Sequence, residues 1–266
     1  MSDTLWSELT SSGKLGPHRI HFLAHAESTN SLALELLGKQ EVDAGTVIVA
    51  NSQSAGRGRL GRPWVSPADT GLYFSCIVRP ELSPADFPKI TLAAGLAVFL
   101  AVEKETGIRL GLKWPNDLFL NGKKCGGILT ETQAIAGQDS PAVVIGIGLN
   151  INTALADFPA EVAERATSLY AETQRIFARG PLLAAILEEL ESLLAQLELD
   201  GFPQILRLWR QHDIHAGKTV TWLNSQGELV TGLSLGPDEE GILRIRDAAG
   251  KTHTVISGDV SLASLR

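Results

Sequence analysis

Residues 142–148 read Ala-Val-Val-Ile-Gly-Ile-Gly, a continuous apolar run that constrains the fold more than any other segment. A strand that is apolar at every position is typical of the centre of a sheet covered on both faces. Helices can supply that cover, because apolar residues within 90–107 and 181–199 recur at helical spacing. The sequence therefore predicts an α/β (α+β) chain in which strands and helices alternate.

Shorter elements fill the rest of the chain. We expect strands over 19–23, 46–50, 72–78, 109–113, 118–120 and 126–131, and further helices over 28–37 and 202–212. Gly38 is expected to end the first of these helices, and Asn121-Gly122 to form a two-residue hairpin turn. After residue 218, short strands alternate with turns at 224–227, 236–238 and 248–250, the pattern of a small barrel. We therefore predict two domains, 1–213 and 214–266.

Composition limits the class of protein. The 266 residues are 44% hydrophobic, which supports a large core, and carry a net charge of −7, whereas general nucleic-acid binding needs a positive face. No apolar run approaches the ~18 residues that span a bilayer, and Met1–Trp6 lacks the features of a signal peptide. The two cysteines show no metal-type spacing. These features predict a cytoplasmic protein that binds neither DNA nor a membrane.

The segment Gly56–Trp64 reads Gly-Arg-Gly-Arg-Leu-Gly-Arg-Pro-Trp. Glycines let a backbone wrap closely around a ligand, and arginines supply forked cationic donors for phosphate or carboxylate oxygens. The same glycines match the dinucleotide fingerprint, but that motif needs a strand directly before it and a helix after it. Here five residues intervene after the strand at 46–50, and a strand follows. A solvated basic loop is the simpler alternative; we interpret the segment as a loop that grips a nucleotide or an acyl phosphate.

Three further motifs lie in the same half of the chain. Lys113-Trp114-Pro115-Asn116-Asp117 follows a strand, where active-site groups often sit, although it could be an ordinary proline turn. Lys124 precedes a glycine pair that permits close approach, although it could be an exposed hairpin lysine. Residues 146–152, Gly-Ile-Gly-Leu-Asn-Ile-Asn, leave room for a ligand at the end of the buried strand, or for tight strand packing.

Together these motifs closely resemble the catalytic domain of biotin protein ligases. That family carries the Gly-Arg-Gly-Arg-x-Gly-Arg loop, Lys-Trp-Pro-Asn-Asp, a lysine before a small-residue pair and Gly-x-Gly-x-Asn; Ser28-Thr29-Asn30 and Gln53 also match. The resemblance is dense over 17–152 and weaker beyond. It implies a mixed-sheet catalytic domain of the biotin/lipoate ligase type followed by a small SH3-like β-barrel. Longer members add an N-terminal helix-turn-helix, but this chain reaches Ser28 too soon for one, so we expect no operator binding.

The resemblance also implies a reaction. In that family the biotin carboxylate attacks the α-phosphate of MgATP to give biotinyl-5'-AMP, and a lysine of a biotin carboxyl carrier protein then displaces AMP. The substrates would be biotin and MgATP, with no tightly bound prosthetic group. By position, the resemblance implies that the catalytic groups are Lys113, Lys124 and Arg59, and that Asp117 binds magnesium. The residues implied to bind biotin are Ser28, Thr29, Asn30, Gln53, Arg57, Gly58, Arg59, Lys124, Gly126 and Gly127. Those implied to bind ATP and the adenylate are Arg57, Arg59, Arg62, Trp64, Lys113, Asn116 and Asn150.

One position departs from the family pattern. Cys125 stands where an aliphatic residue is commoner, and octanoyl and lipoyl transferases of the same fold can pass an acyl group through cysteine. We interpret Cys125 as an apolar filler. The alternatives to a biotin ligase are a lipoate ligase or octanoyltransferase, and a non-catalytic biotin sensor. An exposed sheet edge could receive the acceptor protein or a second copy of the chain as a homodimer.

Overall fold

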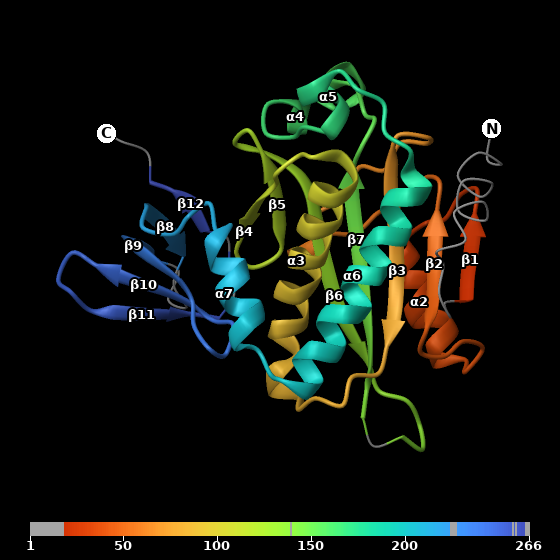
Figure 1. The fold of residues 1–266 in the computed structure, drawn as a ribbon, viewed down its shortest axis with the longest axis horizontal. Helices are drawn as coiled ribbons and strands as arrows, with labels where there is room; N and C mark the ends of the chain where they lie inside the picture. Colours follow the sequence, from red (N-terminus) through yellow and green to blue (C-terminus); the bar gives the residue numbers. More distant parts are fainter. Residues whose placement is uncertain (1–18, 139, 224–227, 257, 259, 264–266) are drawn as a thin grey trace.

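The computed structural model describes residues 19–138, 140–223, 228–256, 258 and 260–263. Its centre is a seven-stranded mixed sheet in the order β1-β2-β3-β7-β6-β5-β4 (Figure 1). The strands are β1 (Arg19–Leu23), β2 (Thr46–Ala50), β3 (Gly71–Val78), β7 (Ala142–Asn150), β6 (Lys123–Gln133), β5 (Asp117–Leu120) and β4 (Gly111–Lys113). Only β1 and β2 pair in parallel; the other neighbours are antiparallel. The apolar strand β7 is the central one, as predicted.

Helices cover both faces of this sheet. Helix α2 (Thr29–Gly38) packs on one face, where Ile48 and Val144 point toward it. Helices α3 (Phe87–Thr106) and α6 (Arg179–Leu199) pack on the other face and against each other. Successive residues of β7 therefore enter different halves of the core, which explains why the strand is apolar from Ala142 to Leu149.

Three details of the predicted elements need correction. Gly38 lies inside α2, which is capped by Lys39, and Gln40 takes the left-handed conformation expected for a terminating glycine. The strand expected over 109–113 is shortened to β4, at 111–113. Helix α3 begins at Phe87, earlier than the expected 90–107. The segment 84–106 that contains α3 is long and apolar enough to cross a bilayer by length and composition alone, but its longest uncharged run is 90–102, and most of the segment is buried inside the protein.

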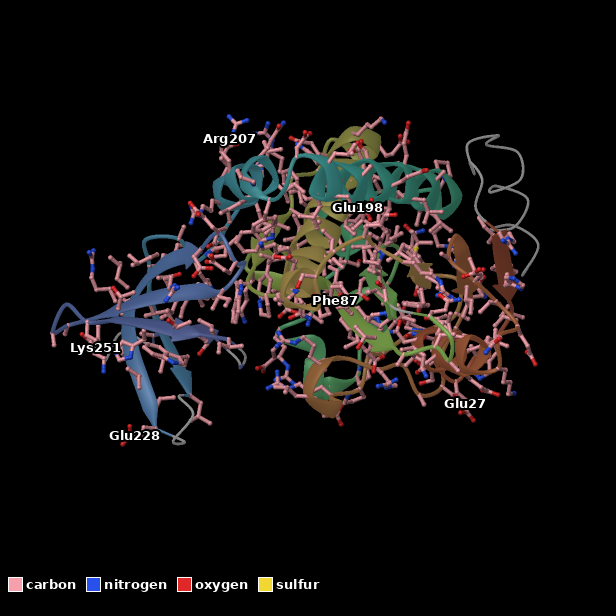
Figure 2. The ribbon with its side chains drawn as sticks, turned by 90° about the horizontal axis from the view of Figure 1, so that it is seen from below. Glu27, Phe87, Glu198, Arg207, Glu228 and Lys251 are labelled. Carbon is pink, nitrogen blue, oxygen red and sulfur yellow. The ribbon has the colours of Figure 1, made fainter. Side chains whose placement is uncertain are left out.

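A second sheet follows at the β4 edge of the first. Helix α7 (Pro203–Gln211) leads into five antiparallel strands in the order β11-β10-β9-β8-β12. They are β8 (Thr219–Leu223), β9 (Leu229–Pro237), β10 (Leu243–Asp247), β11 (Thr252–Val255) and β12 (Val260–Leu262). The view from below shows this sheet, which carries Lys251 and Glu228, at the end of the molecule opposite Glu27 (Figure 2). The turn predicted at 224–227 lies outside the described residues.

The connection between the sheets is itself built into the first sheet. The Leu112 amide donates to the His212 carbonyl at 2.8 Å, and the Ile214 amide donates to the Leu112 carbonyl at 2.9 Å. Gly111 makes this approach possible, because a Cβ there would lie 2.2 Å from Ile214 Cγ2. The boundary at 213/214 remains a prediction, but the residues around it extend the β4 edge rather than form a free linker.

A buried carboxyl at this junction predicts a specific pH dependence. Asp213 Oδ1 accepts from the His215 amide at 2.9 Å, whereas Oδ2 is buried and finds no hydrogen-bond partner among the described residues. Burial raises the pKa of Asp213 to about 6. As the pH rises, Asp213 therefore loses its proton in the unfolded chain before it does so in the folded protein. The protonated Asp213 carboxyl favours the folded state at low pH, and this contribution to the free energy of unfolding is lost as the pH rises from 4 to 6.

The Asp213→Asn side chain cannot titrate, so the variant should not lose stability for this reason as the pH rises. The free energy of unfolding of the variant, relative to the wild type, should rise by about 2–3 kcal/mol between pH 4 and pH 7. Urea denaturation across that range measures the difference. A difference that is the same at every pH would contradict the assignment.

Candidate active site

A cavity of about 670 Å³ opens where the loop after β2 meets the ends of β4, β6 and β7. Its size is that of a small-molecule site. It brings together almost every residue singled out in the sequence: Ser28, Thr29, Asn30, Gln53, Arg57, Gly58, Arg59, Arg62, Trp64, Lys113, Asn116, Asp117, Lys124, Gly127 and Asn150. Gly126 is the exception. A Cβ there would meet Leu118 and the Gly148 carbonyl, so Gly126 serves strand packing.

The charge of the lining is strongly one-sided. Six cationic side chains border the cavity, and Asp117 is the one carboxylate among its described lining residues. The cations are Arg57, Arg59, Arg62, Lys113, Lys124 and Arg165. In a chain of net charge −7 this concentration marks a site for a small anion.

One end of the cavity is built by buried polar groups at the start of α2. Ser28 caps the helix by accepting from the Ser31 amide at 3.4 Å. The Gln53 side-chain carbonyl accepts from the Thr29 amide at 2.9 Å, and its NH₂ group donates to Ser66 Oγ at 2.8 Å. These contacts fix Thr29 and Gln53 side by side, so the wall presents a preset arrangement of donors and acceptors to a ligand.

Asn30 has a structural role in the same wall. Its Nδ2 donates to the Leu129 carbonyl at 3.1 Å and to Glu131 Oε2 at 3.0 Å, and Ser75 Oγ lies 2.5 Å from its Oδ1. Both amide hydrogens are thus in use within the protein. Asn30 therefore joins β3 and β6 to α2 while it also lines the cavity, and its assignment to biotin stays a prediction.

The Gly-Arg loop, defined as residues 56–64, is a short hairpin over the cavity. The Trp64 amide donates to the Gly56 carbonyl at 2.8 Å, and the Gly58 amide donates to the Arg62 carbonyl at 2.7 Å. Leu60 forms the exposed tip with a positive φ of 58°. The hairpin is tethered at two points, by Arg57 to Glu131 at 2.6 Å and by Arg59 to Asn116 Oδ1 at 3.1 Å.

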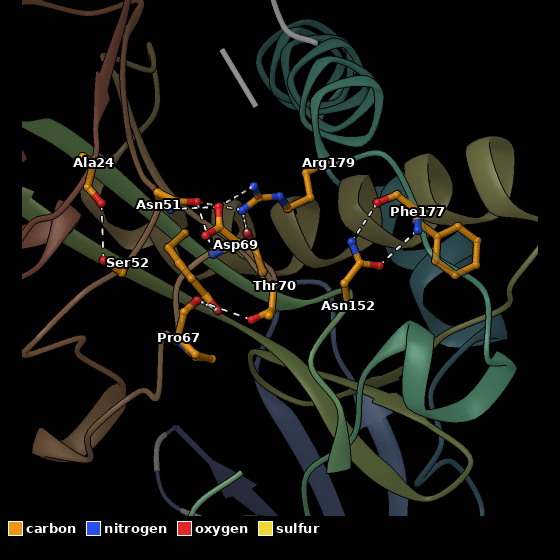
Figure 3. Close-up of polar contacts among 11 residues, drawn as sticks. Ala24, Asn51, Ser52, Pro67, Asp69, Thr70, Asn152, Phe177 and Arg179 are labelled. Atoms are coloured by element: carbon orange, nitrogen blue, oxygen red, sulfur yellow. Dashed lines mark hydrogen bonds and ion pairs between the residues drawn. The ribbon is translucent and has the colours of Figure 1, made fainter. Parts of the chain in front are cut away.

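The base of the segment between β2 and β3 is clamped by a buried arginine. Figure 3 shows Arg179, at the start of α6, extending its guanidinium group toward Asn51 and Asp69. Its Nη1 donates to Asn51 Oδ1 at 2.9 Å, and its Nη2 lies 3.5 Å from Asp69 Oδ1. Asn51 Nδ2 also donates to Asp69 Oδ1 at 3.2 Å. The two ends of the segment are thereby held together while the Gly-Arg loop extends from it.

The turn after β4 positions a lysine, an amide and a tryptophan. The Trp114–Pro115 peptide bond is cis, and the Trp114 indole donates to the Gly241 carbonyl of the second sheet at 3.0 Å. Asn116 is held by donating Nδ2 to the Ile128 carbonyl at 2.8 Å. Lys113 Nζ lies 5.4 Å from the centre of the Phe119 ring. The turn therefore joins the cavity to the second sheet.

Lys124 forms the closest ion pair of the cavity. Its Nζ lies 2.5 Å from Asp117 Oδ1 and 5.5 Å from the centre of the Trp64 ring. The pair holds the Lys124 ammonium and the Asp117 carboxylate together at the cavity, and the assignment of Asp117 to magnesium stays a prediction.

The backbone at Lys124 is also fixed, by a segment that the sequence reading left out. The Lys124 amide donates to the Arg165 carbonyl at 2.8 Å, and the Thr167 amide donates to the Lys124 carbonyl at 2.9 Å. Asn150 Nδ2 holds the Thr167 carbonyl at 3.0 Å. The same stretch adds Phe158, Val162 and Arg165 to the lining. This segment follows the Gly-x-Gly-x-Asn strand in the sequence, and that position could have indicated that it borders the cavity.

The surroundings of Cys125 agree with its interpretation as an apolar filler. The side chain is fully buried, and burial raises the pKa of the thiol to about 12. Cys125→Ala is expected to leave turnover unchanged and to cost about 1 kcal/mol of stability, because one buried heavy atom is lost. Steady-state kinetics and denaturation measure the two effects; a loss of turnover by orders of magnitude would show that acyl transfer passes through sulfur.

Comparisons with known proteins agree with the geometry. Residues 22–150 match the Biotin/lipoate A/B protein ligase family, and residues 215–263 match the Biotin protein ligase C terminal domain. The chain is 36% identical to the bifunctional ligase/repressor BirA of Bacillus subtilis over 91% of this chain and 74% of that protein. It is 34% identical to the biotin--[acetyl-CoA-carboxylase] ligase of Mycobacterium tuberculosis, over 92% of this chain and 89% of that protein.

Solved structures give the same result. The biotin protein ligase from Aquifex aeolicus in complex with biotin and ATP superposes with a TM-score of 0.78 at 32% identity, over 92% of this chain and 98% of that one. The predicted fold, a mixed-sheet domain followed by an SH3-like domain, is thereby confirmed. The chain belongs to the biotin protein ligases, the ATP-dependent enzymes within the biotin/lipoate A/B protein ligase family.

Proposed function

We propose that this chain joins biotin to a protein lysine in two half-reactions within the described cavity. In the first, the biotin carboxylate attacks the α-phosphate of MgATP, forming biotinyl-5'-AMP and expelling pyrophosphate. In the second, a lysine amine attacks the acyl carbonyl, forming an amide and releasing AMP and a proton. The observation that carries the proposal is the set of six cations beside the buried wall at Thr29 and Gln53.

The first half-reaction gathers several negative oxygens in one place. Lys113 and Lys124 approach that place from two strands, and we assign them to the α-phosphate and to the reacting carboxylate, respectively. Such fixed donors contribute roughly 3–4 kcal/mol each to a transition state that gains charge. Arg59 and Arg62 would face the adenylate and the leaving pyrophosphate, and magnesium would enter on the phosphates of ATP.

Biotin would occupy the wall at the start of α2. Its ureido ring presents two N–H donors and one carbonyl acceptor, which suit the hydroxyl and amide groups of Ser28, Thr29 and Gln53. Its alkyl chain would pass the apolar lining formed by Phe74, Ile128 and Ile147. The acid would then meet the nucleotide beneath the Gly-Arg loop, which excludes water from the anhydride.

The acceptor we propose is a biotin carboxyl carrier domain, the substrate class that the family implies. Gly258, which lies between β11 and β12, also lines the cavity, so we propose that the domain at 214–266 covers the nucleotide or the acceptor. The predicted homodimer through a sheet edge stays a prediction.

The transfer step can be tested separately from adenylation. The chain is first incubated with biotin and MgATP, then mixed with a carrier domain while intact mass is followed. We expect the carrier to gain one biotin within a single turnover, and a carrier with its target lysine changed to arginine to gain none. Equal labelling of both carriers would contradict transfer to a specific lysine.

A further inference from the structure

The Arg57 side chain borders the cavity and is paired with two residues beyond the cavity lining. Its Nη2 lies 2.6 Å from Glu131 Oε1 on β6, and its Nη1 donates to Ser31 Oγ on α2 at 3.2 Å. Neither Glu131 nor Ser31 lines the cavity. Arg57 therefore joins the Gly-Arg loop to β6 and α2.

Glu131 is itself held in place, unlike a carboxylate of an ordinary surface pair. Its second oxygen, Oε2, accepts from Asn30 Nδ2 at 3.0 Å. Asn30 is buried and is fixed in turn by Ser75 and by the Leu129 carbonyl. The ion pair therefore needs little further ordering of its acidic partner, which is the main cost of most exposed pairs.

We propose that Glu131 is a positioning residue that latches the Gly-Arg loop over the cavity and sets how long the acyl adenylate is retained. The chain of contacts runs from the wall at Thr29, through Ser75 and Asn30, to Glu131 and then to Arg57. A ligand that settles against that wall thereby favours the position of the residue that holds the loop down. Glu131 touches no reacting atom, so its removal should affect retention more than chemistry.

This inference rests on the proposed function, and the test separates the two. Glu131→Gln keeps an acceptor for Asn30 but removes the charge that pairs with Arg57. Biotinyl-5'-AMP formed in the variant is expected to dissociate about fivefold faster, and the KM for biotin to rise by a similar factor, while kcat for pyrophosphate release stays within about twofold. Arg57→Gln, which removes the other half of the ion pair, should release biotinyl-5'-AMP at least as fast as Glu131→Gln, and the double variant should release it no faster than Arg57→Gln alone.

Limited digestion with trypsin supplies a readout that needs no activity. The loop holds three arginines, so Glu131→Gln without substrates should be cleaved there about fivefold faster than the wild type, with an unchanged melting temperature. Asp43→Asn, which breaks the remote 2.8 Å Arg79–Asp43 pair, is the matched control and should change neither readout. Wild-type rates of cleavage and adenylate release in Glu131→Gln, or additive effects in the double variant, would overturn the latch. Failure of the wild type to release pyrophosphate would instead overturn the proposed function. The trypsin cleavage rates would still test whether Glu131 holds the Gly-Arg loop.

Discussion

Lys124→Met is expected to reduce biotin-dependent pyrophosphate release by about 10²- to 10³-fold. Methionine keeps the length and apolar character of the lysine stem but removes the ammonium group that lies 2.5 Å from Asp117 and next to Trp64. The reaction would then bring carboxylate and phosphate together against an unpaired aspartate, so electrostatic repulsion adds to the lost attraction. A coupled pyrophosphate assay at saturating ATP measures the effect.

The neighbouring lysine provides the control. Lys123 occupies the same hairpin, but it does not line the cavity. Lys123→Met should therefore keep wild-type activity within about twofold, since removal of a partly exposed charge outside the site has little effect. Equal losses in both variants would show that the hairpin matters as a whole and would contradict a specific role for Lys124.

Gly146→Ala is expected to raise the Kd for biotin at least tenfold and to lower stability by about 1–3 kcal/mol through overpacking. A Cβ at this position would lie 2.0 Å from Asn30 Oδ1, which is buried and cannot simply turn outward. Displacement of Asn30 would break its contacts with Ser75 and Glu131, and so disturb both the biotin wall and the latch. Isothermal titration with biotin and a urea denaturation curve report the two effects.

Gly95→Ala adds the same methyl group at another buried glycine. Its Cβ would find no atom closer than 3.9 Å, and it lies within helix α3, where alanine is favoured over glycine by up to about 1 kcal/mol. Biotin binding should be unaffected and stability equal or higher. If Gly146→Ala binds biotin as tightly as the Gly95→Ala control, the proposed role of Asn30 in the wall is wrong.

The parts of the fold with strong local signals could be predicted from the sequence. Ser28 is a good helix cap and indeed begins α2, and Asn121-Gly122 forms its hairpin turn with two positive φ angles. The apolar run at 142–148 correctly indicated a central strand, because only a strand covered on both faces can be apolar throughout. These features depend on neighbours along the chain, which a sequence displays directly.

Features that depend on distant residues could not be predicted. Gly146 and Gly148 both line the cavity, but the sequence does not show that a Cβ at these positions would meet Asn30 and the Trp64 indole. Ser75 stands in an apolar strand, and nothing nearby in sequence indicates that it holds Thr29 and Asn30, some 45 residues earlier. Likewise, the pairing of residues 212–214 with β4 joins segments about 100 residues apart. The residues that line the site could therefore be predicted from their motifs, whereas the residues that hold them in place could not.

Pyrophosphate release from MgATP, measured in parallel with biotin, lipoate and octanoate, tests the central claim most directly. We expect release with biotin alone, and the loss of this release in Lys113→Ala and Arg59→Ala. Release with lipoate or octanoate in place of biotin would contradict the assignment of Ser28, Thr29 and Gln53 to the ureido ring. Tight binding of biotin without any release of pyrophosphate would contradict the enzymatic function and would indicate a biotin-binding sensor.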